Sequence, residues 1–257
     1  MRLKNKVAVI TGAANGIGLA ISEAFVKEGA IVFAGDIDEE KCKTEMKRLN
    51  KDATAVIRAV KCDVGLTKDV GDLIHSTINE FGRIDVLVNN AAIAIKVNIM
   101  EMPEEDWDML MNTNLKSIYR TIKATLPSMV KQRSGSVINL ASAQAFRSWH
   151  DFTAYAGAKG AILSMTNQLA GQFGEYNVRF NSISPGAILT PMNEKRAQEE
   201  GPEFIIKSEA MHAMKRMGIP MEVAMTVVFL ASEEAGFITG EDIKVDGGLC
   251  TLPRYIE

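Results

Sequence analysis

Short apolar runs alternate with amphipathic segments along almost the whole chain. The runs are rich in Val and Ile and carry little charge, which is typical of strands buried on both faces of a parallel sheet. They predict seven strands, over residues 7–10, 31–35, 55–61, 84–88, 135–140, 178–183 and 243–245. Between them, apolar residues recur at helical spacing and predict helices near residues 17–28, 38–49, 67–81, 104–130, 153–174 and 221–232.

This alternation predicts a single α/β domain over residues 1–257, with a doubly wound, seven-stranded parallel sheet and helices on both faces. Right-handed crossovers then bring the carboxyl ends of all strands to one edge, where ligands bind in such folds. Residues 191–219 interrupt the rhythm with methionines among charged residues. We expect a substrate lid there, the alternative being an amphipathic helix pair packed on the sheet.

Three glycines, at positions 12, 16 and 18, follow the first predicted strand and open an amphipathic helix. A helix entered through such a turn offers free N–H groups and its positive dipole end to a pyrophosphate. Gly12 would permit the tight turn, Gly16 the approach of the phosphates, and Gly18 close packing of helix on strand. The pattern predicts a dinucleotide-binding (Rossmann) domain, the alternative being a glycine-rich loop that only turns the chain.

An aspartate, Asp36, ends the second predicted strand, eighteen residues beyond Gly18. A carboxylate at this place can accept hydrogen bonds from the ribose diol of an adenosine. It would repel a 2′-phosphate, and neither Gly35 nor Ile37 supplies a cation to hold one. We therefore expect NAD as the cofactor in preference to NADP. The alternative role for Asp36 is a turn or helix cap.

A serine, a tyrosine and a lysine form the candidate catalytic group. Ser142 ends the fifth predicted strand, and thirteen residues later Tyr155 and Lys159 stand one helical turn apart, on the same face. A tyrosine hydroxyl has a pKa near 10, too high for a base at neutral pH, but a nearby ammonium favours the tyrosinate. A Tyr-x-x-x-Lys pair alone would more often be a surface pair.

Together these motifs resemble the short-chain dehydrogenase/reductase family over residues 3–248. The resemblance is carried by Thr-Gly-x-x-x-Gly-Ile-Gly at 11–18, Asn-Asn-Ala-Ala at 89–92, an upstream Asn114, Ser142 and Tyr-x-x-x-Lys at 155–159. It implies that Tyr155 transfers the proton, Ser142 holds the substrate oxygen, and Lys159 lowers the tyrosine pKa and binds the nicotinamide ribose. It implies that Asn114 bends its helix and continues the proton path through a water.

The resemblance also implies a row of contacts along the carboxyl edge of the sheet. The cofactor contacts are Gly12, Asn15, Gly16, Ile17, Gly18, Asp36, Ile37, Asp63, Val64, Asn90, Ala91, Ala92, Tyr155, Lys159, Pro185, Gly186, Ile188 and Thr190. The candidate substrate contacts are Ser142, Gln144, Trp149, His150 and Tyr155, although for His150 a plain surface position fits as well. No metal ligand set is expected.

The function expected from these residues is hydride transfer between NAD(H) and a secondary alcohol or carbonyl, with a sugar, a polyol or another small alcohol as substrate. One alternative is a 3-oxoacyl-thioester (acyl-carrier) reductase, which shares every motif but normally prefers NADP, against which Asp36 argues. A second alternative is an NAD-sensing binding protein without catalysis. The intact Ser142, Tyr155 and Lys159 argue against a sensor.

Charge and composition limit the classes of partner that this chain is expected to bind. The 257 residues carry a net charge of −3, which gives no reason to expect a nucleic acid or an anionic membrane as partner. No apolar stretch approaches the ~20 residues of a membrane helix, and none fits a signal peptide, so we expect a cytoplasmic protein. Cys42, Cys62 and Cys250 are odd in number and scattered, which predicts reduced thiols.

A second partner is expected from apolar residues on the predicted helices 104–130 and 153–174, and the resemblance implies that it is a copy of this chain within a homotetramer. These residues suggest a surface too broad for one sheet contact: Trp107, Leu110, Met111, Ile118, Ala154, Ala158, Ala161, Ile162 and Met165. The resemblance implies that the two helices pair with their copies across a two-fold axis, and the alternative is a monomer in which these residues fill the core. The tail over 249–257 is expected to pack on a neighbouring subunit.

Overall fold

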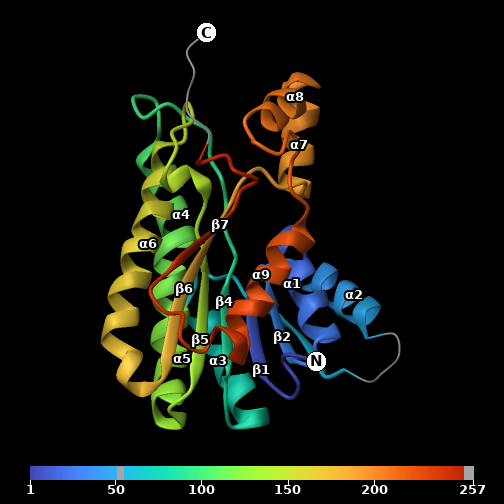
Figure 1. Ribbon diagram of the computed structural model, residues 1–257, viewed down its shortest axis with the longest axis vertical. Coiled ribbons are helices and arrows are strands. Elements are labelled where there is room, and N and C mark those ends of the chain that lie inside the picture. The colour runs from blue at the N-terminus through green and yellow to red at the C-terminus, as the bar shows by residue number, and fades with distance from the viewer. Residues whose placement is uncertain (51–54, 252–257) are drawn as a thin grey trace.

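A seven-stranded parallel sheet with helices on both faces forms the centre of the molecule (Figure 1). This computed structural model describes residues 1–50 and 55–251. The strands are β1 (Val7–Thr11), β2 (Ile31–Asp36), β3 (Ile57–Lys61), β4 (Val86–Asn89), β5 (Gly135–Leu140), β6 (Val178–Pro185) and β7 (Asp242–Val245). Their order is β3-β2-β1-β4-β5-β6-β7, and all neighbours are parallel. The order reverses between β1 and β4, which confirms the doubly wound fold and locates the ligand crevice.

The longer helices of the described chain surround the sheet. They are α1 (Gly16–Lys27), α2 (Glu39–Leu49), α3 (Thr67–Phe81), α4 (Glu104–Met111), α5 (Ser117–Gln132), α6 (Thr153–Phe173), α7 (Pro191–Glu200), α8 (Glu203–Ala210) and α9 (Pro220–Ala231). Successive residues of β1 point to opposite faces: Ala8 and Ile10 into the core beneath α1 and α9, Val7 and Val9 into the core beneath α3 and α5. Two cores therefore fix the sheet between the helix layers.

The helix predicted over 104–130 is interrupted. Between α4 and α5 lies the π-helical turn η1 (Asn112–Lys116), at the place where asparagines of poor helix propensity stand in the sequence. Smaller differences concern the ends of strands, since β2 includes Asp36 and β6 continues to Pro185. As a result, two predicted site residues, Asp36 and Pro185, are the last residues of their strands.

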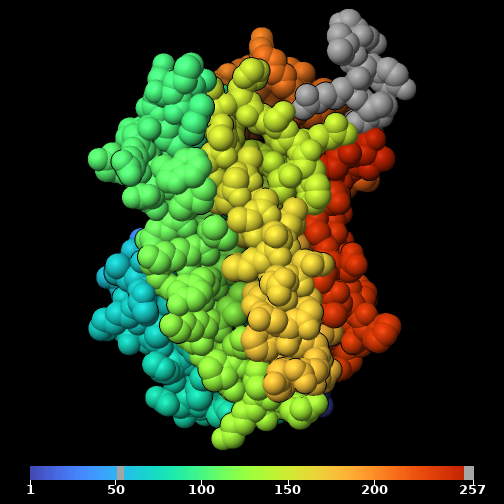
Figure 2. Space-filling model, turned by 90° about the vertical axis from the view of Figure 1, so that its left-hand side faces the viewer, coloured from blue at the N-terminus to red at the C-terminus, as the bar shows by residue number. Residues whose placement is uncertain are grey.

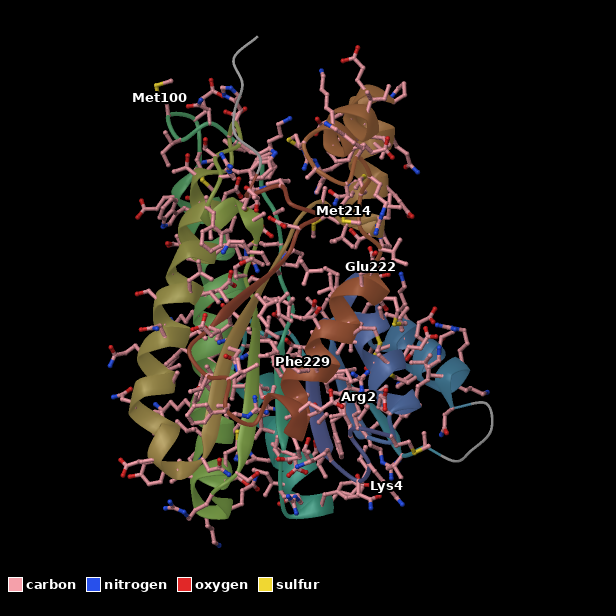
Figure 3. The ribbon with its side chains drawn as sticks, in the orientation of Figure 1. Arg2, Lys4, Met100, Met214, Glu222 and Phe229 are labelled. Carbon is pink, nitrogen blue, oxygen red and sulfur yellow. The ribbon has the colours of Figure 1, made fainter. Side chains whose placement is uncertain are left out.

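The helices α7 and α8 stand beyond the carboxyl edge of the sheet instead of lying on one of its faces (Figure 1). No residue of α7 is buried. The loop that carries Met100 lies at the same end of the molecule, on the opposite side from α7 and α8 (Figure 3). The segment predicted as a lid thus rises beside the ligand crevice.

The surface formed by α4, α5 and α6 corrects part of the reasoning about assembly (Figure 2). Five of the nine apolar residues cited for a second partner are buried within the chain's own cores: Leu110, Ile118, Ala154, Ala158 and Ile162. Met111, Ala161 and Met165 instead line a groove of about 700 Å³, together with Leu115 and Tyr119. The apolar surface that could contact a second chain is therefore narrower than the sequence predicted.

Three further expectations concern membranes, thiols and the tail. Within the described residues, no helix has the length and apolar character needed to cross a membrane. All three cysteines are free thiols, and burial raises the pKa of both Cys42 and Cys62 to about 12. The part of the tail over 252–257 lies outside the described residues.

Candidate active site

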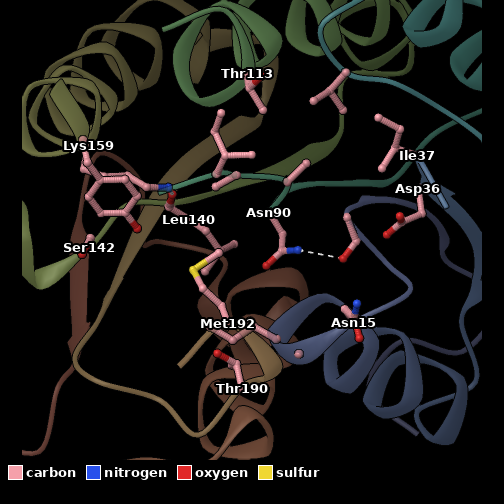
Figure 4. Close-up of a pocket in the computed structure, with 18 of the residues that line it drawn as sticks. Asn15, Asp36, Ile37, Asn90, Thr113, Leu140, Ser142, Lys159, Thr190 and Met192 are labelled. Carbon is pink, nitrogen blue, oxygen red and sulfur yellow. Dashed lines mark hydrogen bonds between the residues drawn. The ribbon is translucent and has the colours of Figure 1, made fainter. Parts of the chain in front are cut away.

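A cavity of about 650 Å³ opens at the carboxyl edge of the sheet and collects the predicted site residues (Figure 4). It is lined by every residue predicted to contact the cofactor except Gly18. Asp36 and Ile37 lie at one end, and Ser142 and Lys159 lie at the other. The crevice therefore joins the two groups of residues that the sequence singled out.

The glycine turn after β1 has the conformation that the sequence pattern requires. Gly12 and Gly16 have positive φ angles, 65° and 49°, which side chains make unfavourable. A Cβ atom on Gly18 would lie 1.9 Å from the carbonyl oxygen of Gly12, so Gly18 lets α1 pack against the turn. Gly18 thus does not line the cavity but allows the glycine turn that does.

The start of α1 leaves its N–H groups free of side-chain caps. Asn15 is the N-cap residue, and its side chain makes no capping hydrogen bond. The side-chain amide of Asn90 donates to the carbonyl oxygens of Thr11 and Gly12, both at 3.0 Å, and so braces the turn. A rigid turn with open N–H groups at the positive end of a helix is suited to a pyrophosphate.

The carboxylate of Asp36 is buried and held by two backbone groups. Oδ2 accepts a hydrogen bond from the amide of Ala14 at 2.8 Å, and Oδ1 accepts one from Asp38 at 3.0 Å. The second bond makes the turn that the sequence offered as an alternative role, and both oxygens keep lone pairs for further donors. Among the described residues that line this cavity, Lys159 is the only cation, and it lies at the far end.

Tyr155, Ser142 and Lys159 meet at that far end. The ammonium of Lys159, only 3% exposed, donates to the Leu140 carbonyl at 2.6 Å and lies 5.5 Å from the centre of the Tyr155 ring. Burial lowers the pKa of Lys159 to about 8. Burial raises the pKa of Tyr155, and its hydrogen bond with Ser142 lowers that pKa.

Two opposing effects act on the Tyr155 hydroxyl. Burial raises its pKa, and this effect is the larger one, while the hydrogen bond with Ser142 lowers the pKa. The lowering of the tyrosine pKa that the resemblance assigned to Lys159 stays a prediction.

Asn114 is buried beside the cavity and does not line it. Its side chain accepts a hydrogen bond from the amide of Ile93 and donates one to the carbonyl of Ile93, both at 2.8 Å. It therefore ties the π-helical turn to the segment after β4. Its expected part in a proton path stays a prediction.

A second cavity, of about 500 Å³, adjoins the first at Ser142, Pro185 and Gly186. The predicted substrate residues Gln144, Trp149 and His150 line it, as do side chains that the sequence did not single out: Lys96, Phe152, Arg196, Glu200 and Phe204. Tyr155 lines the first cavity. The substrate residues are thus divided between two neighbouring cavities.

The similarity to known proteins covers nearly the whole chain. A family model described as enoyl-(acyl carrier protein) reductase matches residues 12–250. The 3-oxoacyl-(acyl-carrier-protein) reductase of Thermotoga maritima is 37% identical over 249 residues, 97% of this chain and 99% of that protein. The structure of the aldohexose dehydrogenase of Thermoplasma acidophilum has a TM-score of 0.89 at 34% identity, covering 99% of this chain and 98% of that one. A short-chain type dehydrogenase/reductase from Mycobacterium marinum has a TM-score of 0.91 at 29% identity, covering 98% and 97%.

This chain belongs to the short-chain dehydrogenase/reductase family. It is an oxidoreductase of a family that binds a nicotinamide cofactor. The residues present fit that group: positive-φ glycines and an uncapped helix start for a pyrophosphate, Asp36 for a ribose, and Lys159 and Tyr155 at the opposite end.

Two residues of this short-chain dehydrogenase/reductase escaped the sequence analysis. His212 is buried behind the turn after β6; its Nε2 accepts from the amide of Ala187 at 3.1 Å, and its Nδ1 lies 2.6 Å from the carbonyl oxygen of Ser208. Arg196 of α7 lies over the rings of Phe152 and Phe204, at 5.2 and 4.6 Å. Neither is part of a periodic pattern or a motif, so nothing in the sequence alone pointed to them.

Proposed function

We propose that this chain is an NAD-dependent oxidoreductase that moves a hydride between NAD(H) and a small secondary alcohol or carbonyl, of the sugar or polyol type. The observation that carries the proposal is one cavity with Asp36 at one end and Ser142, Tyr155 and Lys159 at the other. A buried carboxylate favours a free ribose diol over a 2′-phosphate here, because the only cation among the described residues that line the cavity is Lys159 at the far end. Similarity to an aldohexose dehydrogenase supports the substrate class.

The chemistry is divided among three side chains. NAD, when bound, supplies the hydride acceptor. Ser142 donates a hydrogen bond to the substrate oxygen, and Tyr155 takes the alcohol proton during oxidation and returns it during reduction. Lys159 lies within the cavity wall, where its ammonium can donate to ribose hydroxyls while Leu140 holds it in place.

The protonation state of Tyr155 makes the rates of oxidation and reduction depend on pH in opposite senses. Burial raises the pKa of the phenol, so the proton is retained. A protonated phenol is the acid that carbonyl reduction needs, whereas oxidation needs the phenolate. We therefore expect oxidation to speed up with rising pH and reduction to slow down.

A second candidate is the reduction of a 3-oxoacyl thioester. It is supported by the 37% identity to a 3-oxoacyl-(acyl-carrier-protein) reductase. Both candidates use the same catalytic residues, so the substrate and the cofactor distinguish them.

A substrate screen tests the proposal directly. Sugars, polyols, hydroxysteroids and 3-oxoacyl thioesters are each assayed with the NAD and the NADP form of the cofactor by following nicotinamide absorbance. Turnover of a sugar or polyol with NAD supports the proposal. A protein that turns over only 3-oxoacyl thioesters, and prefers NADPH, contradicts it and establishes the second candidate.

The proposal includes a lid over 191–219 and a homotetramer. Support for the lid comes from α7 and α8, which rise beside the second cavity and contribute Arg196, Glu200 and Phe204 to its wall. Support for assembly comes from the groove between α4–α5 and α6. Light scattering of an active sample tests the tetramer, since a mass near the 28.0 kDa of one chain would exclude it.

A further inference from the structure

Arg120, on α5, is a buried cation that the proposed chemistry does not use. Its side chain lies among neutral oxygens, and only 9% of the residue is exposed. Nε donates to the hydroxyl of Thr67 at 3.2 Å, and Nη1 donates to the carbonyls of Val64 and Asn112, both at 3.3 Å. Nη2 donates to Oδ1 of Asn112 at 2.5 Å. Burying a guanidinium is costly unless its N–H donors have acceptors. Here they find acceptors in the loop at Val64, at Thr67 in the start of α3, and at Asn112 in η1.

Two of those segments line the first cavity. Val64 and Gly65 belong to the loop after β3, and Asn112 belongs to the π-helical turn η1. The Asn112 amide also donates to the carbonyl of Gly65 at 3.2 Å. A Cβ atom on Gly65 would lie 3.0 Å from Nδ2 of Asn112, so loop and turn are in close contact. Arg120 stabilises this contact, because it donates hydrogen bonds to both the loop and the turn.

The same turn leads to the other end of the cavity. The carbonyl of Asn112 accepts the i→i+5 hydrogen bond from Ser117 as well as the bond from Arg120. Asn114, two residues along, holds both backbone groups of Ile93, which lines the cavity. Val64 is thus connected to Ile93 by the hydrogen bonds of Arg120, the backbone of η1 and the hydrogen bonds of Asn114.

We propose that Arg120 is a positioning residue for the cofactor. It holds the loop at Val64 and Gly65 against η1 and so fixes the cavity wall at which the adenosine half of the cofactor binds. Lysine cannot replace it, because a single ammonium cannot reach Thr67, Val64 and Asn112 together. The assignment of the adenosine half to this wall rests on the proposed function.

The test measures binding without turnover. Arg120→Met and Arg120→Lys are compared with the parent and with Arg58→Met, which removes an exposed arginine paired with Glu80. Dissociation constants are measured for ADP-ribose and for whichever reduced dinucleotide the parent binds better, so that a preference for NADPH would overturn the cofactor assignment and leave this test intact. We expect both Arg120 variants to bind both ligands about ten-fold more weakly, and Arg58→Met to bind as the parent does.

Three further readouts separate positioning from simple stability. In Arg120→Lys, the KM for the dinucleotide should rise while the KM for the second substrate stays at the parental value. In a double-mutant cycle with Asn112→Ala, the combined loss of ADP-ribose affinity should be smaller than the sum of the single losses, because the two side chains act as one unit. Circular dichroism shows whether each variant is folded, and Arg120→Lys decides the matter if Arg120→Met is not. Parental ADP-ribose affinity in a folded Arg120→Lys, or additive losses in the cycle, would overturn the proposal.

Discussion

The two neighbouring cavities are built in different ways. The walls of the first cavity, which we propose to hold the cofactor and call the cofactor cavity, are fixed by the main chain: Gly12 and Gly16 by their φ angles, Asp36 by two amides, and Asn90 by two carbonyls. The cavity beside it is closed by long side chains from distant segments. Arg196 of α7 lies over Phe152, and Glu200 pairs with Lys96 at 3.4 Å.

This difference has an energetic consequence. Short hydrogen bonds between buried groups leave costly unpaired donors when they break, so the cofactor cavity is expected to keep its shape. Exposed ion pairs and cation–π contacts contribute roughly 0–1 kcal/mol each, so α7 and α8 can be displaced at little cost. Substitutions at the cofactor end should therefore act strongly, and substitutions at the substrate end weakly and mainly on KM.

The largest expected effect lies at the Tyr155 end of the first cavity. Tyr155→Phe keeps the ring and its edge contact with Phe152 but removes the acidic proton. We expect kcat to fall by about 10²–10⁴-fold while NADH affinity stays at the parental value. Stopped-flow or steady-state absorbance measures kcat, and Tyr119→Phe, which alters an exposed tyrosine of α5, serves as the control. A Tyr155→Phe protein with parental kcat would remove Tyr155 from the mechanism.

The second effect tests the cofactor end itself. Asp36→Ala removes the acceptor of Ala14 and Asp38 together with the proposed ribose contact. Hydrogen bonds to charged groups contribute about 1.5–3 kcal/mol, so kcat/KM with NAD should fall about 10- to 100-fold, and kcat/KM with NADP should fall less. Asp72→Ala, at an exposed carboxylate paired with Lys68, is the matched control. A parent that already prefers NADP would end the argument for NAD.

The cofactor end could be predicted from the sequence because its determinants are local. A strand, a glycine turn and a helix follow one another in the chain, and Asp36 ends the next strand, so periodicity and glycine spacing suffice. The helical spacing of Tyr155 and Lys159 is likewise local. Periodicity predicted one helix over 104–130; the resemblance implied a bend at Asn114, and the structure shows that the interruption is a π-helical turn.

The walls of the second cavity and the support of the turn after β6 depend on contacts between residues far apart in the chain, which a single sequence does not reveal. The stacking of Arg196 on Phe152 joins α7 to the start of α6. His212 binds the amide of Ala187, in the turn after β6, 25 positions earlier in the chain. The hydrogen bonds of Tyr155 with Ser142 and of Lys159 with the carbonyl of Leu140 likewise join residues that are more than ten positions apart.

The third effect concerns the stability cost of the catalytic lysine. Burial lowers the pKa of Lys159 from 10.5 to about 8, which corresponds to a penalty of about 3 kcal/mol on the charged form. Lys159→Met removes that penalty but leaves the Leu140 carbonyl unpaired, so we expect a net gain of about 2 kcal/mol in the free energy of unfolding at pH 7, with loss of turnover.

The pH dependence of this gain provides its check. Between about pH 8 and 10.5 the unfolded state binds more protons at Lys159 than the folded state does, so the parent gains stability as the pH rises. The advantage of Lys159→Met should be complete below pH 8, shrink between pH 8 and 10.5, and become a deficit of about 1 kcal/mol above about pH 10.5, where only the lost hydrogen bond to Leu140 remains. Urea unfolding at several pH values measures it, and an advantage independent of pH would contradict the buried-charge explanation.

The smallest effect is expected at the substrate end, and it tests whether α7 is held by side chains alone. Arg196→Met removes the contacts with Phe152 and Phe204 and the ion pair with Glu200 while keeping an apolar stem. Each contact contributes no more than about 1 kcal/mol, so we expect the KM for the alcohol or carbonyl to rise about five-fold, with NADH affinity and kcat near the parental values. Lys195→Met, its neighbour on α7 that pairs with Glu199, is the control. A loss of NADH affinity in Arg196→Met would show that the two cavities are coupled, and the contrast between them would then no longer hold.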